Sequence, residues 1–354
     1  MSRHPITANL LRWYDRHARD LPWRHIQNPY FIWVSEIMLQ QTQVETVIPY
    51  YRRFIAKFPC VNALAEARAD EILKIWENLG YYSRARHLLA AAKELVARWE
   101  GRLPQTIKDL LTLPGVGEYT AAAILSIAFG RPVAAIDGNV SRVICRVFAL
   151  RTPLGAPESR QQIRDLADQL LSKRRPGHFN QAVMDLGATV CTPRTPSCLS
   201  CPLRSFCMAN GLGLQEKLPV SRKRSPLPHK HMTAAIIPDR KKRVLVVRRP
   251  ESGLLGGLWK FPGEERGAKE AVKEALARTV REELGLWIRA GKKVASVKHA
   301  YTHFRVTFHV YRCAIERGRP RSLEGREWKW VPAEELRRLA LSKAERKILE
   351  ALHS

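Results

Sequence analysis

Four of the seven cysteines lie close together in the sequence. Their spacing is Cys191-x6-Cys198-x2-Cys201-x5-Cys207. Prolines between them predict a compact loop rather than a helix, which would present Arg194 and Arg204 to phosphates. Four thiolates in so short a stretch suit either a tetrahedral zinc ion or a cubane iron–sulfur cluster, and general chemistry does not separate the two. Because protein side chains fill all four ligand positions, we expect a structural site.

Two carboxylates are candidates for acid–base chemistry. Glu36 lies in a helical segment, residues 33–43, whose other side chains are apolar or uncharged. Such surroundings would raise the pKa of the carboxyl and suit a general acid, although a solvated Glu on a helix face is the commoner case. Asp137 is placed to cap the next helix and could also be catalytic. Cleavage of a glycosidic bond needs one acid and one anion, but the sequence does not show that the two residues meet.

A glycine-containing hairpin separates two helical stretches, residues 107–112 and 118–129. Its sequence is Leu113-Pro-Gly-Val-Gly117. Gly115 and Gly117 permit a tight turn whose backbone N–H groups converge at a helix start, where they can hold a DNA phosphate without reading sequence. An ordinary helix–helix turn is the simpler interpretation of this motif alone.

The charge of the chain favours a polyanionic partner. There are 60 Lys and Arg against 33 Asp and Glu, which gives a net charge of +27. Nucleic acid is the leading candidate and an anionic membrane surface is the alternative. No stretch approaches the roughly 18 apolar residues of a membrane span, and the first residues do not resemble a secretory signal. We therefore expect a soluble, cytoplasmic protein, associated with the nucleoid if it is bacterial.

The elements that position these residues fall into two regions. Residues 1–211 are expected to be mostly α-helical, with a helix that begins at Asn28-Pro29 and with Ile37, Gln41, Val44 and Ile48 at helical spacing after it. Residues 212–231 are basic and rich in proline, which predicts an extended linker. Residues 232–354 are expected to form an α+β domain, with strands near 243–249 and 304–310 and a helix over 268–284 that stops at Gly285.

The hairpin, Asp137 and the cysteine spacing together resemble the endonuclease III superfamily of helix–hairpin–helix glycosylases, in which a loop of this spacing holds a 4Fe–4S cluster. Three segments, residues 33–43, 80–84 and 136–140, closely resemble the adenine DNA glycosylases of the MutY type. The resemblance covers nearly the whole chain and is strongest before residue 210. It implies a helix–hairpin–helix bundle with an iron–sulfur loop, followed by an α+β Nudix-like domain.

The resemblance also implies the reaction. Bifunctional relatives have a lysine two residues after the second glycine of the hairpin, where this chain has Tyr119. Without that amine, Schiff-base chemistry and strand cleavage lose their nucleophile. The implied activity is hydrolysis: Glu36 protonates adenine, Asp137 stabilises the cationic sugar, and Asn139 and Tyr119 orient these groups.

Other residues have implied roles in binding DNA, from which adenine must be flipped out. Gln41 and Tyr81 would wedge into the base stack, while Gly115 and Gly117 hold the backbone. The adenine pocket would be formed by Arg24, Leu39 and Gln181. Without the family, Gln181 is equally well a polar surface residue and Tyr81 a core aromatic.

The second domain resembles Nudix hydrolases with an incomplete catalytic box. Residues 278–286 follow Glu270 with the spacing of the box, but Thr279 stands where an active box has a metal-binding Glu, and Gly263 is one residue out of register. We therefore expect a recognition domain. Its 8-oxoguanine sensor would be Tyr301-Thr302-His303, which resembles the family's Phe-Ser-His loop, although His303 alone would be read as a half-exposed strand residue.

Three functions remain in view. The first is a monofunctional glycosylase that removes adenine opposite 8-oxoguanine or guanine in duplex DNA and acts as a monomer. The second is a relative that removes another mispaired base, such as thymine opposite guanine, although the C-terminal domain argues against it. The third is a non-catalytic DNA-binding iron–sulfur protein, which would need neither Glu36 nor Asp137.

Overall fold

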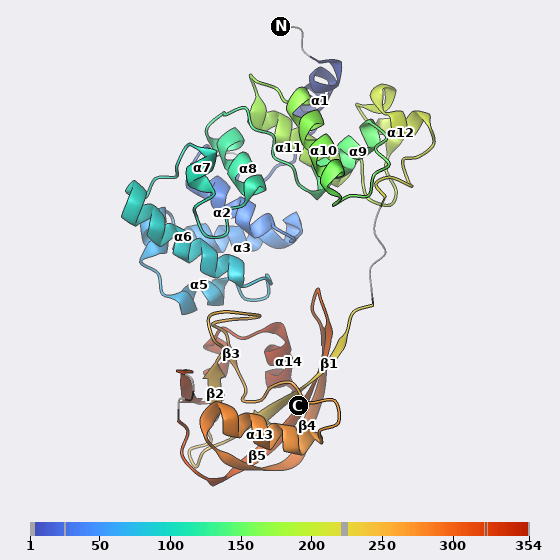
Figure 1. Cartoon of the computed structure of the whole chain (residues 1–354). Coiled ribbons are helices and arrows are strands. Elements are labelled where there is room, and N and C mark those ends of the chain that lie inside the picture. The colour runs from blue at the N-terminus through green and yellow to red at the C-terminus, as the bar shows by residue number, and fades with distance from the viewer. Residues whose placement is uncertain (1–3, 25, 221–225, 322, 324, 353–354) are drawn as a thin grey trace. The chain divides into compact units, whose positions relative to one another are not determined.

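The computed structural model describes residues 4–24, 26–220, 226–321, 323 and 325–352. The chain forms two compact units, Met1–Glu66 with Ala90–Arg224 and Ala67–Leu89 with Ser225–Ser354 (Figure 1). In the described residues no helix is long and apolar enough to cross a membrane.

The first unit consists of helices and short 3-10 turns in its described residues. Its helices are α1 (Pro5–His17), α2 (Pro29–Leu39), α3 (Val44–Lys57), α4 (Val61–Ala65), α7 (Ile107–Leu110), α8 (Glu118–Ala128), α9 (Gly138–Val147), α10 (Pro157–Leu170), α11 (Pro176–Thr189) and α12 (Met208–Gly211), with part of α6 (Ser83–Trp99). The 3-10 turns are η1 (Cys198–Ser200) and η2 (Arg204–Phe206). This confirms the predicted helical character of the N-terminal region.

Helix α2 carries the candidate acid and is buried on nearly every side. The Asn28 side chain caps it by accepting a hydrogen bond from Tyr30 N (2.9 Å), and Pro29 occupies the first turn, as predicted. The residues at helical spacing after Pro29, which are Ile37, Gln41, Val44 and Ile48, do not all belong to one helix. Helix α2 ends at Leu39, Gln41 has a φ of 56°, and α3 begins at Val44. Because a left-handed residue cannot continue an α-helix, the helical period is divided between two helices.

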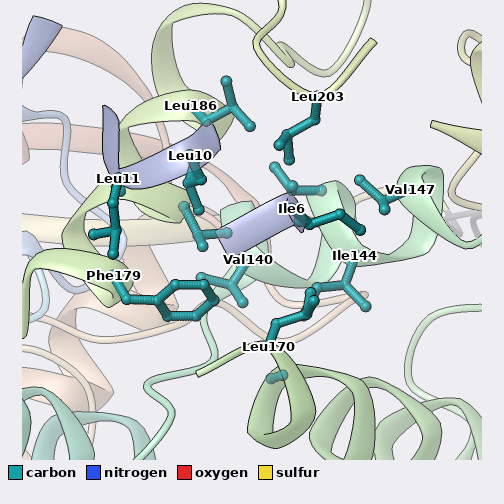
Figure 2. Packing of buried hydrophobic residues seen from close by; sticks show 14 of the residues in the cluster. Ile6, Leu10, Leu11, Val140, Ile144, Val147, Leu170, Phe179, Leu186 and Leu203 are labelled. Atoms are coloured by element: carbon teal, nitrogen blue, oxygen red, sulfur yellow. The ribbon is translucent and has the colours of Figure 1, made fainter. Parts of the chain in front are cut away.

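One hydrophobic cluster joins helices of the first unit that are far apart in the sequence. Side chains of α1, such as Ile6 and Leu10, meet Val140 and Ile144 of α9 and Phe179 of α11 (Figure 2). Burial of such side chains stabilises each by roughly 1.5–3 kcal/mol. The cluster therefore fixes α9, and with it the aspartate that precedes this helix.

The second unit contains two three-stranded sheets. The sheets have the orders β1-β5-β4 and β3-β2-β6, in which β1 (His229–Ile236) is parallel to β5 (Arg305–Arg317), and β4 (Trp287–Ala300) is antiparallel to β5. In the other sheet, β3 (Trp259–Lys260) and β6 (Trp328–Val331) both run antiparallel to β2 (Val244–Arg248). The remaining elements of this unit are α5 (Ala69–Ile75), α13 (Val272–Leu284), η3 (Leu336–Arg338) and α14 (Lys343–Ala351).

Alternating strand residues pack on two separate clusters. Ala235 and Leu245 pack with Leu276 and Leu284 of α13, whereas their neighbours Ala234 and Val246 belong to the cluster that contains Ile348 of α14. Because successive strand side chains point to opposite faces, the two helices cover opposite sides of the sheets. The predicted α+β character is confirmed, and α13 ends at Gly285, whose φ is 66°, as predicted.

The segment assigned to the linker, residues 212–231, lies partly outside the described residues. Of the described part, Leu218 is buried and packs with Cys145 and Ala209 of the first unit. At the other end, β1 already begins at His229.

Candidate active site

Glu36 is a buried carboxyl in the middle of α2. Its side chain is 5% exposed, and the Tyr119 hydroxyl donates a hydrogen bond to its Oε2 (2.7 Å). The pKa of Glu36 is raised to about 7, mainly by burial and also by the charge of Asp137, while the Tyr119 hydrogen bond and Arg24 oppose the shift. The expectation of a raised pKa is therefore confirmed.

Asp137 caps helix α9. Its Oδ1 accepts a hydrogen bond from Val140 N (2.7 Å), and its Oδ2 accepts one from Asn139 Nδ2 (2.9 Å). Burial raises the pKa of Asp137, and these hydrogen bonds together with the charge of Arg142 oppose the rise. The capping prediction is confirmed, and both carboxylate oxygens are held in place.

Arg142 fixes the orientation of Asn139, a relationship that sequence reasoning missed. Arg142 donates to Asn139 Oδ1 (2.7 Å) and to Gly187 O (2.8 Å). Because the amide oxygen of Asn139 faces Arg142, its NH2 group faces Asp137. Gly187 is required here, since a Cβ at this position would lie 2.7 Å from Asn139 Cβ. In the sequence, this contact was indicated only by the position of Arg142, five residues after Asp137 in the first turns of a capped helix.

Tyr119 connects the two carboxylates electrostatically. It lies in the first turn of α8, and burial followed by the charges of Glu36 and Asp137 raises its pKa well above the usual value. The hydroxyl therefore stays protonated and can donate to Glu36. Buried Glu36 and half-buried Tyr119 and Asp137 thus interact with one another, although they come from α2, α8 and the start of α9.

Two of the three residues expected in the adenine pocket line one cavity. Arg24 and Gln181 line a cavity of about 850 Å³ together with residues of α1, α8 and α11. Gln181 is anchored through a hydrogen bond from its Nε2 to Gly177 O (3.2 Å). Leu39, at the end of α2, is half-buried but is not among the residues that line this cavity.

Asp185 holds Arg24 and was missed by sequence reasoning. Its carboxylate is fully buried and accepts hydrogen bonds from Arg24 at both oxygens (2.7 and 2.9 Å) and from Arg19 Nε (2.7 Å). These bonds keep the pKa of Asp185 low despite its burial. In the sequence, the only indication of a buried ion pair was that Asp185 is an acidic residue within the largely apolar helix α11.

The hairpin has the geometry expected of a tight turn. Gly115 has a φ of 77°, and Gly117 is the extended N-cap residue of α8, with no side chain capping the helix start. Both glycines are exposed. Gln41 is also exposed, in the left-handed turn after α2.

The four clustered cysteines line a single cavity, as the spacing predicts. Arg146 is 1% exposed and ties their loop to α9, since it donates to Cys191 Sγ (3.3 Å), Thr192 O (2.7 Å) and Pro193 O (3.0 Å). Within the described chain, no three His, Cys, Asp or Glu side chains are grouped to hold a single metal ion. Four thiols that line one cavity are a donor set that both a structural zinc ion and an iron–sulfur cluster use.

The residues expected to sense the opposite base lie in the second unit. Tyr81 has a φ of 47°, and its hydroxyl donates to Thr302 Oγ1 (2.8 Å). Thr302 and His303 are exposed in the turn between β4 and β5. The ring of Tyr301 is half-buried and packs against Phe304, with ring centroids 5.0 Å apart.

Comparisons with known proteins agree with this arrangement. Residues 34–171 match the HhH-GPD superfamily of base excision DNA repair proteins, and residues 233–351 match the NUDIX domain. The chain is similar to "Adenine DNA glycosylase" of Homo sapiens (36% identity over 96% of this chain and 72% of the relative). It is also similar to the rat protein of that name (38% over 96% and 76%).

Two solved structures resemble the helical region. A thermostable thymine-DNA glycosylase is 31% identical and covers 58% of this chain and 95% of its own, with a TM-score of 0.53. A trapped endonuclease III–DNA covalent intermediate is 22% identical over 59% of this chain and 95% of its own, with a TM-score of 0.52, and shows likeness of fold. With the relatives above, these findings place the chain in the adenine DNA glycosylase family of helix–hairpin–helix base excision repair enzymes, which hydrolyse N-glycosyl bonds.

Proposed function

We propose that this enzyme hydrolyses the N-glycosidic bond of adenine mispaired with 8-oxoguanine or guanine in double-stranded DNA and leaves an abasic site. The observation that carries the proposal is that buried Glu36 accepts a hydrogen bond from Tyr119 and interacts electrostatically with Asp137. Glycosidic cleavage uses an acid for the leaving group and an anion for the cationic sugar, and this arrangement supplies both.

The two carboxyls are suited to different roles. With a pKa of about 7, much of Glu36 is protonated at neutral pH and can donate its proton to a ring nitrogen of adenine. Asp137, whose oxygens accept hydrogen bonds from Val140 N and Asn139, is stabilised as an anion beside the developing positive charge. A water molecule completes the hydrolysis. Asn139 and Tyr119 are positioning residues for these two groups.

The reaction should stop at base removal. The phenol of Tyr119 is held by Glu36 and stays protonated, so it provides no amine to attack the sugar. Borohydride should therefore trap little covalent adduct with DNA. Substantial trapping would show that a lysine elsewhere acts as the nucleophile.

Binding of DNA is proposed to use the hairpin and the wedge residues. The uncapped start of α8 after Gly115 and Gly117 suits a phosphate, and the net charge of +27 supplies non-specific attraction. Gln41 and Tyr81 would enter the base stack, and the flipped adenine would be received near Arg24, Leu39 and Gln181. We propose that the enzyme acts as a monomer.

The cofactor is proposed to be a 4Fe–4S cluster. Cys191, Cys198, Cys201 and Cys207 would hold it, and its role is to fix the loop that carries the exposed Arg194 and Arg204. Arg146 holds the backbone of that loop from within. All the chemistry at the sugar is then done by the residues of α2, α8 and α9.

Recognition of 8-oxoguanine is proposed for the second unit, through Tyr301, Thr302 and His303. The hydrogen bond between Tyr81 and Thr302 supports this assignment because it joins a wedge residue to the sensor turn. We propose a helical glycosylase domain over residues 1–211, a linker over 212–231 and a recognition domain over 232–354. Since Ala67–Leu89 belongs to the same compact unit as Ser225–Ser354, point variants test the sensor more cleanly than a deletion of the domain.

The experiment is single-turnover base release from duplexes that carry adenine opposite 8-oxoguanine, guanine or thymine, and thymine opposite guanine. Wild type should release adenine opposite 8-oxoguanine fastest, whereas Glu36→Gln should bind the duplex and release no base. Glu45→Gln, at an exposed position of α3, is the matched control. Unchanged release by Glu36→Gln would remove Glu36 as the acid.

The thymine duplex tests a second candidate function. The 31% identity to a thymine-DNA glycosylase over the helical region favours including it. Faster release of thymine than of adenine would support that activity, and no release from any duplex would support a non-catalytic DNA-binding protein.

A further inference from the structure

A buried lysine in the second unit has an oxygen partner for each of its three N–H donors. Lys260, in β3, is 1% exposed. Its ammonium donates to Gly263 O (2.8 Å) and Glu264 Oε1 (2.6 Å) and contacts Glu283 Oε1. An ammonium has three N–H donors, so these three oxygens use all of them. Lys260 is therefore an internal cation rather than a solvated side chain.

Its partner Glu283 belongs to the Nudix-like box and is equally enclosed. Glu283 is 3% exposed, and it accepts hydrogen bonds from Gly263 N (3.0 Å) and Arg326 (2.7 Å). Lys260 and Arg326 together balance the charges of Glu264 and Glu283. No excess negative charge remains in this cluster to attract a further cation.

The other acidic residues of the box form ion pairs, and one acidic position holds a threonine instead. Glu270 and Glu282 both form ion pairs with Arg278. The distance from Arg278 Nε to Glu270 Oε1 is 2.8 Å, and that from Arg278 Nη1 to Glu282 Oε2 is 2.9 Å. Thr279 is buried, and its hydroxyl donates to Leu276 O (3.2 Å). In the described residues, no group of three acidic, His or Cys side chains is free to hold a metal ion. The residues present therefore do not fit the divalent cation that active Nudix hydrolases use.

The backbone at Gly263 is held in the same arrangement. Its φ is 135°, and a Cβ there would lie 2.4 Å from Thr233 O, so no other residue fits without displacement. Its N–H faces Glu283 and its carbonyl faces Lys260. The backbone of Gly263, the carboxylate of Glu283 and the ammonium of Lys260 thus form one hydrogen-bonded cluster.

We propose that the Lys260 ammonium takes the place of the divalent cation in this Nudix-like fold. The oxygens around it, one backbone carbonyl and two carboxylates, are the donors that Mg²⁺ and Mn²⁺ prefer. The chain thus carries its own counter-cation, and the domain folds without a metal. Removal of the ammonium leaves Gly263 O, Glu264 and Glu283 around a site that takes a divalent cation. This inference concerns the second unit alone and does not depend on the proposed glycosylase reaction.

The test measures Mn²⁺ binding to the full chain from the electron paramagnetic resonance signal of free Mn²⁺. Lys260→Met keeps the side-chain length and removes the charge. It should bind one Mn²⁺ at least ten times more tightly than wild type does. Lys230→Met is the matched control, because Lys230 pairs with Glu265 (2.7 Å) on the surface. This control should behave as wild type.

A loss of stability in Lys260→Met is also informative. If its unfolding midpoint falls, Mn²⁺ should restore it, whereas the double variant Lys260→Met/Glu283→Leu should bind no Mn²⁺ and gain nothing from it. A Lys260→Met protein that neither binds Mn²⁺ nor is stabilised by it would show a purely structural ion pair and overturn the proposal. Wild type that binds Mn²⁺ as tightly as the variant would overturn it as well.

Discussion

The Tyr119 hydroxyl donates a hydrogen bond of 2.7 Å to Glu36 Oε2. The donor comes from the first turn of α8 and the acceptor from the middle of α2. This bond favours the ionised form of a carboxyl whose burial favours the protonated form. Because the two effects oppose each other, the pKa of Glu36 is held at about 7 rather than higher.

Replacement of Tyr119 by Phe should extend activity to higher pH. The variant removes a hydrogen bond that lowers the pKa of Glu36, so the carboxyl stays protonated at higher pH. If protonated Glu36 is the acid, the base-release rate of wild type falls above pH 7 and that of the variant falls at a higher pH. The measurement is single-turnover base release from pH 5 to 9. A fall at unchanged pH would contradict the assignment.

Glu36 should also make stability depend on pH. Its pKa in the folded protein, about 7, lies above the ordinary glutamate value of 4.5, so folding favours the protonated form. The contribution is therefore greatest below pH 4.5 and is lost as pH rises to about 7. The difference corresponds to roughly 3 kcal/mol. Glu36→Gln should remove this dependence, as measured by denaturant unfolding at pH 5 and pH 8.

Asp137 should show separate structural and chemical roles. Asn keeps the cap bond to Val140 N, but its NH2 group would face the NH2 group of Asn139, so Asp137→Asn should cost about 1 kcal/mol of stability. The same variant should lose base release because the negative charge is gone. Asp137→Ala should lose base release and about 2 kcal/mol of stability, because the cap bond is lost as well. An active Asp137→Asn protein would leave the residue as a cap only.

Asp185 should be far more important for stability than an exposed aspartate with a similar partner. Asp185→Asn leaves Arg19 and Arg24 without their buried counter-charge, and such a loss costs about 3–5 kcal/mol. Asp15→Asn breaks the exposed pair with Arg175 and should cost less than about 1 kcal/mol. Urea unfolding of both variants makes the comparison. Equal losses would show that burial of Asp185 does not determine its contribution.

The hydrogen bond between Tyr81 and Thr302 should affect discrimination more than chemistry. Tyr81→Phe and Thr302→Val each remove it, and the double variant should add little to either. Each should reduce the preference for 8-oxoguanine over guanine opposite adenine by about threefold to tenfold. Base release from the two duplexes measures this ratio. Additive effects in the double variant would show that the two side chains act independently.

Local sequence patterns were enough to predict the features that depend on neighbouring residues. Asn28-Pro29 as a helix start, Asp137 as a cap and Gly285 as a helix stop follow from backbone preferences that act over a few residues. The spacing of the four cysteines likewise indicated a shared site, and they line one cavity. The resemblance of these motifs to a known family supplied the reaction.

Which distant residues meet depends on the packing of the folded chain. Helix packing brings Glu36 close to Tyr119 and Asp137, and it brings Asp185 to Arg24. The break of the helical period at Gln41 and the enclosure of Lys260 were also outside the reach of local patterns. Hydrophobic burial is non-directional and acts between residues that are far apart in the chain, so periodicity and composition do not specify its partners.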